Sequence, residues 1–283
     1  RPCGVQRTAL EKEVLIPTEK QDRKMDEKQK AQTGKKYITV FQAIINNYRD
    51  AAFSDGIMSL LFNPFFFARK SLMQQIRELG KSLHGKVLDV GCGLKPYEKL
   101  IKCESYTGLE YAPEGKYAGK ADFTYDGHSF PFQDQEFDSI ITSQVLEHVF
   151  NPEEFLDEIA RCLKDNGPLL LTVPFVWDEH EQPQDFGRYS SFGLRYILEK
   201  HGFQIIEQRK TCNNITLIVQ LLNGYIFKTI KLKNPRLRML LIHIFTMPLN
   251  LIGSFLNLCL PVNDDLYLDN IILARKQQGK SVL

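Results

Sequence analysis

Paired cysteines, a strong net charge and a leading apolar segment are all missing from this sequence. Its six cysteines show no CxxC or similar spacing, which argues against a zinc site or a disulfide framework and favours reduced thiols. The formal net charge of +2 provides no field that would attract nucleic acid. Residues 1–36 are polar and charged, unlike the apolar centre of a signal peptide. We expect a cytoplasmic protein with no nucleic-acid partner and no metal.

The rest of the composition is that of a folded chain. Of the 283 residues, 43% are hydrophobic and 25% are charged, which suits one large domain with an appendage. Residues 1–36 have no sustained apolar period, so we predict a disordered tail there. The segments expected after it are N-terminal helices in 37–84, an α/β core in 85–210, an apolar helical insertion or lid in 211–265, and the last strand with a tail in 266–283.

Strand-like and helix-like segments alternate from residue 86 onward. Short branched apolar runs are separated by helical periods, such as NPEEFLDEIARC with its early proline and glutamates. This alternation predicts an α/β fold with a doubly wound, mostly parallel sheet. The seven expected strands are KVLDV, SYTGLE, ADFTYD, FDSIITSQ, PLLLTVPF, FQIIEQ and YLDNIILARK.

Two glycines one residue apart follow the first of these strands, in KVLDVGCGLKPYE. Because they lack Cβ atoms, Gly91 and Gly93 permit a tight turn that lets a ligand approach the backbone closely. A dinucleotide-binding turn has a third glycine, which is absent here, and Pro96 and Tyr97 would crowd a pyrophosphate. S-Adenosylmethionine carries no phosphate and needs only the close approach and nearby acids. An NAD(P)-binding fold stays open as the alternative.

Acidic or amide side chains stand at the ends of successive strands. Parallel strands direct their carboxyl ends to one edge of a sheet, where ligands bind, so Asp89, Glu110, Asp126 and Gln144 should gather there. Glu110 is placed to accept both ribose hydroxyls of a nucleoside. Asp126 and Gly127 are placed to bind its adenine. One such acid is usually only solvated, but four in register indicate a nucleoside site.

Residues 86–207 resemble a class I S-adenosylmethionine-dependent methyltransferase of the type 11/25 kind. VLDVGCG is similar to that family's first motif, YTGLE to its ribose-binding strand, and YDGHSFPFQDQEFDSIITSQVLEHV to the run from its adenine loop to its LEH motif. The resemblance implies a Rossmann-like fold with S-adenosylmethionine as cofactor. The implied cofactor-binding residues are Asp89, Gly91, Cys92, Gly93, Glu110, Tyr111, Asp126, Gly127, Ser143, Gln144 and His148.

The segment VPFVWDEHEQPQDFGRYSSFG is dense in groups that bind and deprotonate. It resembles a variant of the family associated with bacterial surface-polysaccharide pathways. We assign His180 as the base that removes a hydroxyl proton from the acceptor, Asp185 as the residue that orients it, and Arg188 as a clamp for an acidic or phosphorylated acceptor. The alternatives are that His180 and Arg188 only stabilise the loop, or that Glu179, His180 and Asp185 hold a metal, although their spacing is not a recognisable one.

No charged residue occurs in the apolar segment 239–263, and a basic stretch lies just upstream. The segment is long enough to span a membrane, although Pro248, Asn250 and Gly253 disfavour a clean span. A basic stretch beside an apolar one can also dock on an anionic membrane. We favour a buried lid over the substrate edge of the sheet. The alternative is a peripheral contact of residues 228–262 with the inner face of the membrane.

These patterns together predict an S-adenosylmethionine-dependent methyltransferase. Its expected acceptor is an oxygen of a sugar, of a lipid-linked glycan or of another small molecule. The alternatives are an NAD(P)-dependent oxidoreductase and a non-catalytic module that binds S-adenosylmethionine. The oligomeric state stays open.

Overall fold

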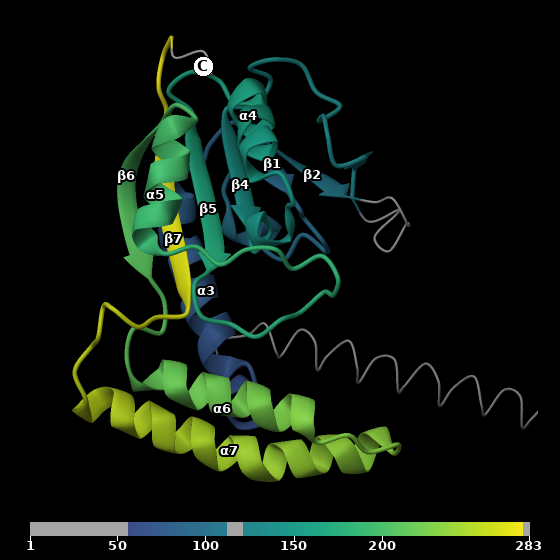
Figure 1. Cartoon of the computed structure of the whole chain (residues 1–283), viewed down its shortest axis with the longest axis vertical. Coiled ribbons are helices and arrows are strands. Elements are labelled where there is room, and N and C mark those ends of the chain that lie inside the picture. Colours follow the sequence, from purple (N-terminus) through teal and green to yellow (C-terminus); the bar gives the residue numbers. More distant parts are fainter. Residues whose placement is uncertain (1–55, 112–120, 280–283) are drawn as a thin grey trace, which may run out of the picture. The chain divides into compact units, whose positions relative to one another are not determined.

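The computed structural model describes residues 56–111 and 121–279, all within the compact unit Ala52–Leu283. The predicted tail in 1–36, the first part of the segment 37–84 and residues 280–283 lie outside the described residues. A seven-stranded sheet of order β3-β2-β1-β4-β5-β7-β6 forms the centre (Figure 1). Its strands are β1 (Lys86–Val90), β2 (Ser105–Tyr111), β3 (Phe123–Tyr125), β4 (Ser139–Ser143), β5 (Pro168–Pro174), β6 (Phe203–Lys210) and β7 (Asp269–Lys276).

The strands at the centre of the sheet are buried on both faces. All seven residues of β5 are buried, which explains why its sequence is a continuous apolar run without polar alternation. The pairs β1–β2, β1–β4, β2–β3 and β4–β5 are parallel, whereas β7 lies antiparallel between β5 and β6. The predicted seven-stranded, mostly parallel α/β fold is therefore confirmed.

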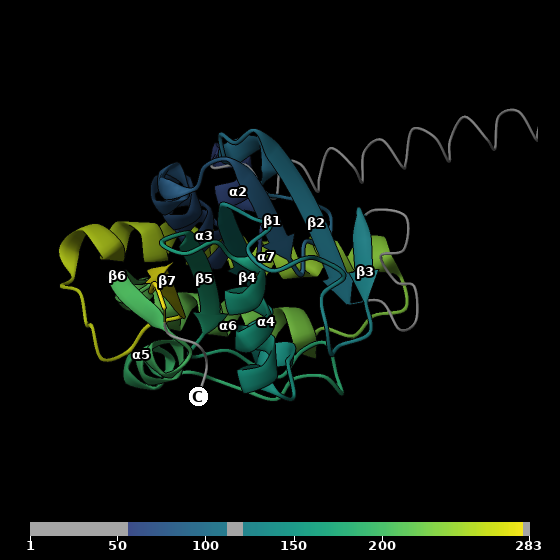
Figure 2. The ribbon, with the colours of Figure 1, turned by 90° about the horizontal axis from the view of Figure 1, so that it is seen from above.

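Helices cover both faces of the sheet (Figure 2). Helices α4 (Pro152–Cys162) and α5 (Ser191–Lys200) bury Phe155, Leu156 and Leu194 in the core cluster of one face. On the other face, Ile76 and Leu79 of α3 (Phe66–Leu79) pack against Leu170 and Ile271. The short elements are the helix α2 (Ile57–Phe62) and the 3-10 turns η1 (Gly80–Ser82), η2 (Glu98–Leu100) and η3 (Leu146–His148).

Two longer helices, α6 (Ile215–Thr229) and α7 (Pro235–Cys259), stand between β6 and β7 in the chain. They pack against each other, α7 also contacts α2, and α6 contacts α3. Figure 1 shows the two side by side, with the arrowheads of β5 and β6 pointing toward them. The α6–α7 hairpin (residues 215–259) therefore lies beyond the carboxyl ends of these strands, where ligands of such sheets bind.

The helical insertion expected in 211–265 is present as α6 and α7, but the expectation that its apolar segment is buried is wrong. In α7 the buried residues are Ile242, Thr246, Asn250 and Gly253, while large apolar side chains are left exposed. By length and composition alone, α7 is also the one helix among the described residues that could cross a membrane. The reason for the error is that neutrality and length do not say which side of a helix is packed.

Candidate active site

The turn after β1 is shaped by its two glycines. Gly91 has φ +74°, its N–H donates to the Leu109 carbonyl at 2.8 Å, and a Cβ there would come within 2.3 Å of Val145 Cγ2. Gly93 has φ +51°, and a Cβ there would meet no described atom within 4 Å. Gly91 is thus required by packing, whereas Gly93 leaves open space beside the turn. That space is what a ligand in close contact with the backbone needs.

Lys95, two residues after Gly93 in the same turn, has the glycine-like value φ +53°. Its ammonium forms an ion pair with Asp122, whose carboxylate also accepts the Gly108 N–H at 2.7 Å. The ion pair and this hydrogen bond hold Lys95 in a backbone conformation that a side chain rarely adopts. Asp122 was not found by sequence reasoning, because its partners are 14 and 27 residues away in the chain.

Glu110 lies where the sequence placed it, near the end of β2. Its Oε2 accepts the Gly93 N–H at 2.7 Å, so the carboxylate and the glycine turn form one local group. Tyr111 stacks edge-on against Tyr125 at a ring distance of 5.9 Å, and a Cβ on Gly127 would come within 3.0 Å of the Tyr111 ring. Asp126 and Gly127 therefore border an aromatic corner, which suits a flat base such as adenine.

Asp89 is buried at the centre of this edge. Its Oδ2 accepts the hydroxyl of Tyr106 at 2.7 Å. Burial raises the pKa of Asp89 to about 7, although the Tyr106 hydrogen bond opposes the shift. A carboxyl with such a pKa gains from a nearby positive charge, because the cation favours its ionised form. Asp89 therefore fits the cationic end of the predicted cofactor.

Three of the other predicted residues are occupied with internal contacts. The Cys92 N–H donates to Leu109, its carbonyl accepts from Lys95, and its thiol is buried against Gly108. Ser143 Oγ lies 2.8 Å from Thr172 Oγ1, and the Gln144 side chain donates to the same oxygen at 3.2 Å. These contacts fix the end of β4 to β5, and they give Cys92 a packing role that the spacing alone did not reveal.

The loop between β5 and α5 (residues 175–190) is held by a buried carboxylate. Asp185 accepts two hydrogen bonds from the Arg188 guanidinium, at 2.6 and 2.7 Å, and one from the His180 backbone N–H at 2.9 Å. The Arg188 hydrogen bonds keep the pKa of Asp185 well below its usual range. Arg188 also donates to the Gly187 and Asp178 carbonyls. These contacts are those of a residue that stabilises the loop. They favour that alternative over the predicted role of Arg188 as a clamp for the acceptor.

The His180 ring lies beside His148, which belongs to the turn that follows β4. Its Nδ1 is 3.2 Å from the Asp178 carbonyl and 3.4 Å from Asp185 Oδ2. Because both neighbours only accept hydrogen bonds, the neutral ring carries its proton on Nδ1 and its lone pair on Nε2. The geometry therefore gives His180 the tautomer of a base, with Asp185 beside it.

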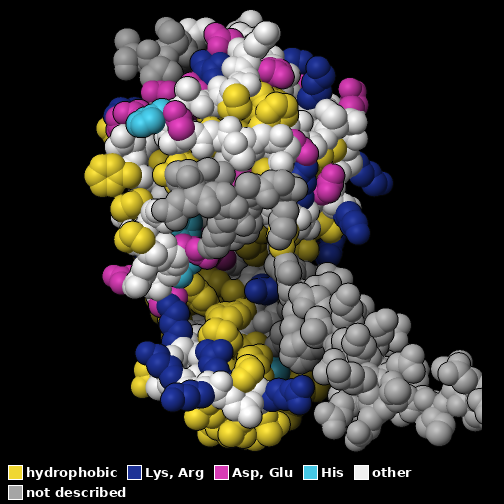
Figure 3. All heavy atoms as spheres, turned by 90° about the vertical axis from the view of Figure 1, so that its right-hand side faces the viewer, with side chains coloured by type: hydrophobic (Ala, Val, Ile, Leu, Met, Phe, Trp, Pro, Cys, Tyr) yellow, Lys and Arg dark blue, Asp and Glu magenta, His cyan; other side chains and the backbone are white. Residues whose placement is uncertain are grey.

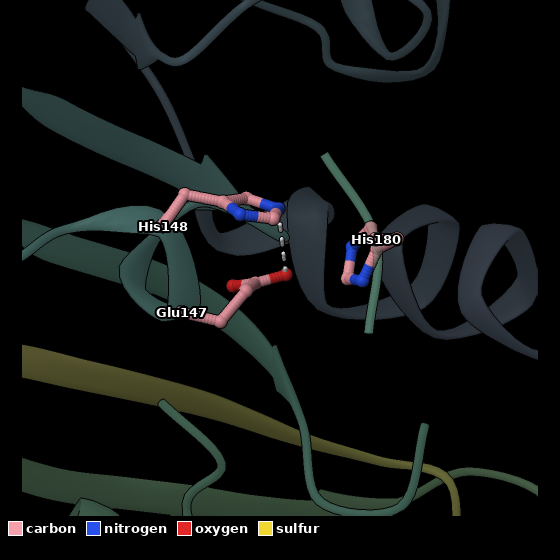
Figure 4. A group of neighbouring side chains, drawn as sticks. All are labelled: Glu147, His148 and His180. Atoms are coloured by element: carbon pink, nitrogen blue, oxygen red, sulfur yellow. Dashed lines mark ion pairs between the residues drawn. The ribbon is translucent and has the colours of Figure 1, made fainter. Parts of the chain in front are cut away.

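Glu147 and His148 complete this group from the 3-10 turn after β4 (Figure 4). The His148 and His180 rings are 4.7 Å apart, and His148 Nε2 lies 3.8 Å from Glu147 Oε1. The Glu147 side chain is fully buried, and its two oxygens accept no hydrogen bond from any described group. Burial raises its pKa to about 8 and lowers the pKa of His148. The sequence analysis did not single out Glu147, because only its burial makes it unusual.

The same three side chains could also hold a divalent cation. One ligand atom from each of Glu147, His148 and His180 lies within 4.8 Å of the others. The His148 Nδ1 contacts the Gln184 carbonyl at 2.5 Å, which leaves its Nε2 available as a ligand. This set differs from the Glu179, His180 and Asp185 set that the sequence suggested.

The comparison with protein families identifies the chain from this core. A family model described as a methyltransferase domain matches residues 66–208, which run from the start of α3 through most of β6. This chain belongs to that family. The methyltransferase core therefore includes the glycine turn, Glu110 and the loop that carries His180.

Relatives of this methyltransferase are distant. An uncharacterized protein of Methanocaldococcus jannaschii is 26% identical over 140 residues, which are 45% of this chain and 68% of that protein. The "Probable tRNA methyltransferase 9B" of Mus musculus is 29% identical over 107 residues, but the match spans 35% of this chain and 23% of that protein. Among solved structures, Haemonchus contortus phosphoethanolamine N-methyltransferase 2 with S-adenosyl-L-methionine has a TM-score of 0.50 at 15% identity and covers 77% of this chain and 55% of its own. That likeness is one of fold.

Proposed function

We propose that this methyltransferase transfers the methyl group of S-adenosylmethionine to a hydroxyl oxygen of a sugar, a lipid-linked glycan or another small molecule. S-Adenosylmethionine as cofactor is the prediction from the sequence, and the family assignment confirms it. The same assignment disfavours the NAD(P)-dependent oxidoreductase. The observation that carries the choice of oxygen is the His180 ring, oriented as a base beside His148.

The residues of the glycine turn would hold the cofactor. The open space at Gly93 and the Glu110 carboxylate beside it suit a ribose, and Asp126 with Gly127 suits the adenine. Asp89 suits the charged methionine end, since its raised pKa indicates a carboxyl that a cation would stabilise. When bound, the cofactor supplies a sulfonium methyl group, whose C–S bond breaks with its electron pair retained on sulfur.

His180 would act on the acceptor. Its Nε2 would accept the hydroxyl proton of the acceptor, while Nδ1–H would stay hydrogen-bonded to the Asp178 carbonyl beside Asp185. The Asp185 carboxylate stabilises the imidazolium that results. Glu147 lies under the two rings, and because burial raises its pKa to about 8 it adds no negative charge there at neutral pH. His148 is held neutral by burial and stays as a neighbour of the base.

The test is methyl transfer from labelled S-adenosylmethionine to a panel of free sugars, nucleotide sugars, lipid-linked glycans and tRNA. We expect turnover with a hydroxyl-bearing glycan or lipid-linked acceptor and none with tRNA. His180→Asn should lower kcat by about a hundredfold or more, because the general base is lost, while calorimetry shows unchanged cofactor affinity. Full turnover of this variant, or loss of turnover on treatment with a chelator, would contradict His180 as a metal-independent base.

A further inference from the structure

In helix α7 the buried and exposed sides are the reverse of those of a usual surface helix: small and polar side chains are buried, and large apolar ones are exposed. Three of its four buried residues, Thr246, Asn250 and Gly253, are polar or small. Its large apolar side chains recur three or four residues apart on the opposite side, and Phe255 is 65% exposed. A helix in water buries its apolar stripe, whereas a helix in lipid packs small and polar residues against its neighbours. The apolar face of α7 is formed mainly by Leu240, Ile244, Phe245, Ile252, Phe255 and Leu258.

Hydrogen bonds lock α7 in this orientation. The buried Asn223 of α6 donates to Asn250 Oδ1 at 2.8 Å. Asn250 in turn donates to the Leu60 carbonyl at 2.8 Å and to the Asn63 carbonyl at 3.0 Å. Rotating α7 to bury its apolar face would break all three bonds and leave buried polar groups unpaired. The exposed apolar face is therefore a stable feature of the fold.

The charged residues within the α6–α7 hairpin have one sign. The sequence contains no aspartate or glutamate between Glu207 and Asp264. Five basic residues surround the turn between α6 and α7, and Figure 3 shows blue side chains around yellow ones at that end of the molecule. Among them, Lys231 and Lys233 are exposed. An apolar face beside a cluster of basic residues matches the chemistry of an anionic bilayer surface.

A cavity of about 240 Å³ lies between this hairpin and the active-site loop. Its lining includes Trp177 and Asp178 of the loop and Gly224 and Tyr225 of α6. A Cβ at Gly224 would meet no described atom within 4 Å, so the helix leaves this space open. Lys228 of α6 forms an ion pair with Asp178 at 2.8 Å, and the Asp178 carbonyl contacts His180. The cavity is therefore bordered both by the α6–α7 hairpin and by the loop that carries His180.

We propose that the α6–α7 hairpin docks on an anionic membrane surface, and that the cavity beside Trp177 binds the apolar chain of a lipid-linked acceptor. The second part rests on the proposed function and narrows its acceptor to a molecule with a lipid chain. Because the polar stripe of α7 stays packed on the protein, the helix lies along the interface and does not cross the bilayer.

Flotation with vesicles of phosphatidylcholine, with and without phosphatidylglycerol, tests the docking. The full-length protein should float with anionic vesicles, and Phe245→Ser/Phe255→Ser should bind at least tenfold less tightly. Lys231→Gln/Lys233→Gln should lower binding about tenfold on anionic vesicles only. The matched control is Phe192→Ser/Tyr196→Ser, which removes two exposed aromatic side chains of α5 and should float normally.

Three outcomes would overturn the docking proposal. They are failure to float with any vesicle, flotation that does not depend on phosphatidylglycerol, and a dimer in sedimentation that dissociates in Phe245→Ser/Phe255→Ser. The last outcome would mean that a second copy of the chain covers the apolar face of α7.

The fluorescence of Trp177 tests the cavity, because it is the only tryptophan in the sequence. Dodecyl phosphate below its micelle concentration should change this fluorescence, and inorganic phosphate should not. Gly224→Leu should abolish the response by filling the space, whereas Gly224→Ala should keep it. A response that survives Gly224→Leu would overturn the cavity assignment. Neither flotation nor Trp177 fluorescence depends on methyl transfer. If only the proposed function were wrong, both would behave as expected while no methyl transfer was detected.

Discussion

Helices α4 and α7 bury opposite kinds of side chain. Helix α4 turns Phe155, Leu156 and Ile159 into the core and leaves its charged residues toward water, as a soluble helix does. Helix α7 turns Thr246 and Asn250 inward and leaves Phe255 outside. The difference teaches that an apolar residue does not by itself mark the core of this protein. Those of α4 pack against the sheet, whereas most of the large apolar residues of α7 lie on an outer surface.

The largest expected effect is on stability, and it compares a buried leucine of α4 with an exposed leucine of α7. Leu156→Ala removes a fully buried side chain of α4 and should lower the free energy of unfolding by about 3–5 kcal/mol, because it leaves a cavity in the core. Leu258→Ala in α7 alters a side chain that is 83% exposed. It should change the free energy of unfolding by less than about 0.5 kcal/mol. Urea denaturation of both variants measures this, and equal losses would contradict the contrast.

The buried polar groups Asn250 and Glu147 differ in their hydrogen bonds: the Asn250 side chain makes three, whereas the two Glu147 oxygens accept none from any described group. Burial raises the pKa of Glu147 to about 8, so the folded protein holds a proton that the unfolded chain releases near pH 4.5. The stability that this proton provides is complete at low pH and is lost as the pH rises toward 8.

In the wild type, the free energy of unfolding should therefore fall between pH 5 and pH 8, by roughly 4 kcal/mol for this group. Glu147→Gln should flatten that fall, and Glu154→Gln, an exposed change on α4, should leave it as it is. Denaturation curves across the pH range measure the slope. An identical slope in Glu147→Gln would show that the carboxyl is ionised in the folded protein.

A substitution at Asn250 tests whether its hydrogen bonds hold α7 in place. Asn250→Ala removes the partner of Asn223 and frees the Leu60 and Asn63 carbonyls, so it should cost about 2–4 kcal/mol of stability. Asn257→Ala, at an exposed position of the same helix, should cost less than about 0.5 kcal/mol. Thermal unfolding compares the two, and a neutral Asn250→Ala would mean that the polar stripe does not hold α7 in place.

A smaller effect is expected on binding at the far side of the sheet. Glu110→Ala should weaken S-adenosylmethionine binding by about 1–3 kcal/mol, because charge-assisted hydrogen bonds to the ribose are lost. Calorimetry measures the affinity, with Glu104→Ala as a surface control outside the site. Undiminished affinity would remove Glu110 from the cofactor site.

The cofactor half of the site was accessible to sequence reasoning. The glycines, Glu110 and Asp126 are close to the strand ends in the chain, so periodicity alone places them on one edge. The acceptor half was only partly accessible. His180 and Asp185 are five residues apart in one loop and do meet, but the approach of His180 to Glu147 and His148 depends on how that loop folds back over η3. Arg188 was predicted to bind the acceptor because a guanidinium suits an acidic group, but in the structure its guanidinium forms hydrogen bonds with Asp185.

By itself, the sequence determined the order of strands and helices, the glycine turn and the family, because these depend on local periodicity and on short motifs. Tertiary structure decided which side of α7 faces the protein and that the Glu147 oxygens accept no hydrogen bond from the described residues. The physical reason is that burial is a property of the packed chain: an apolar segment gains equally from a core or from lipid, and only its neighbours determine which of the two it meets.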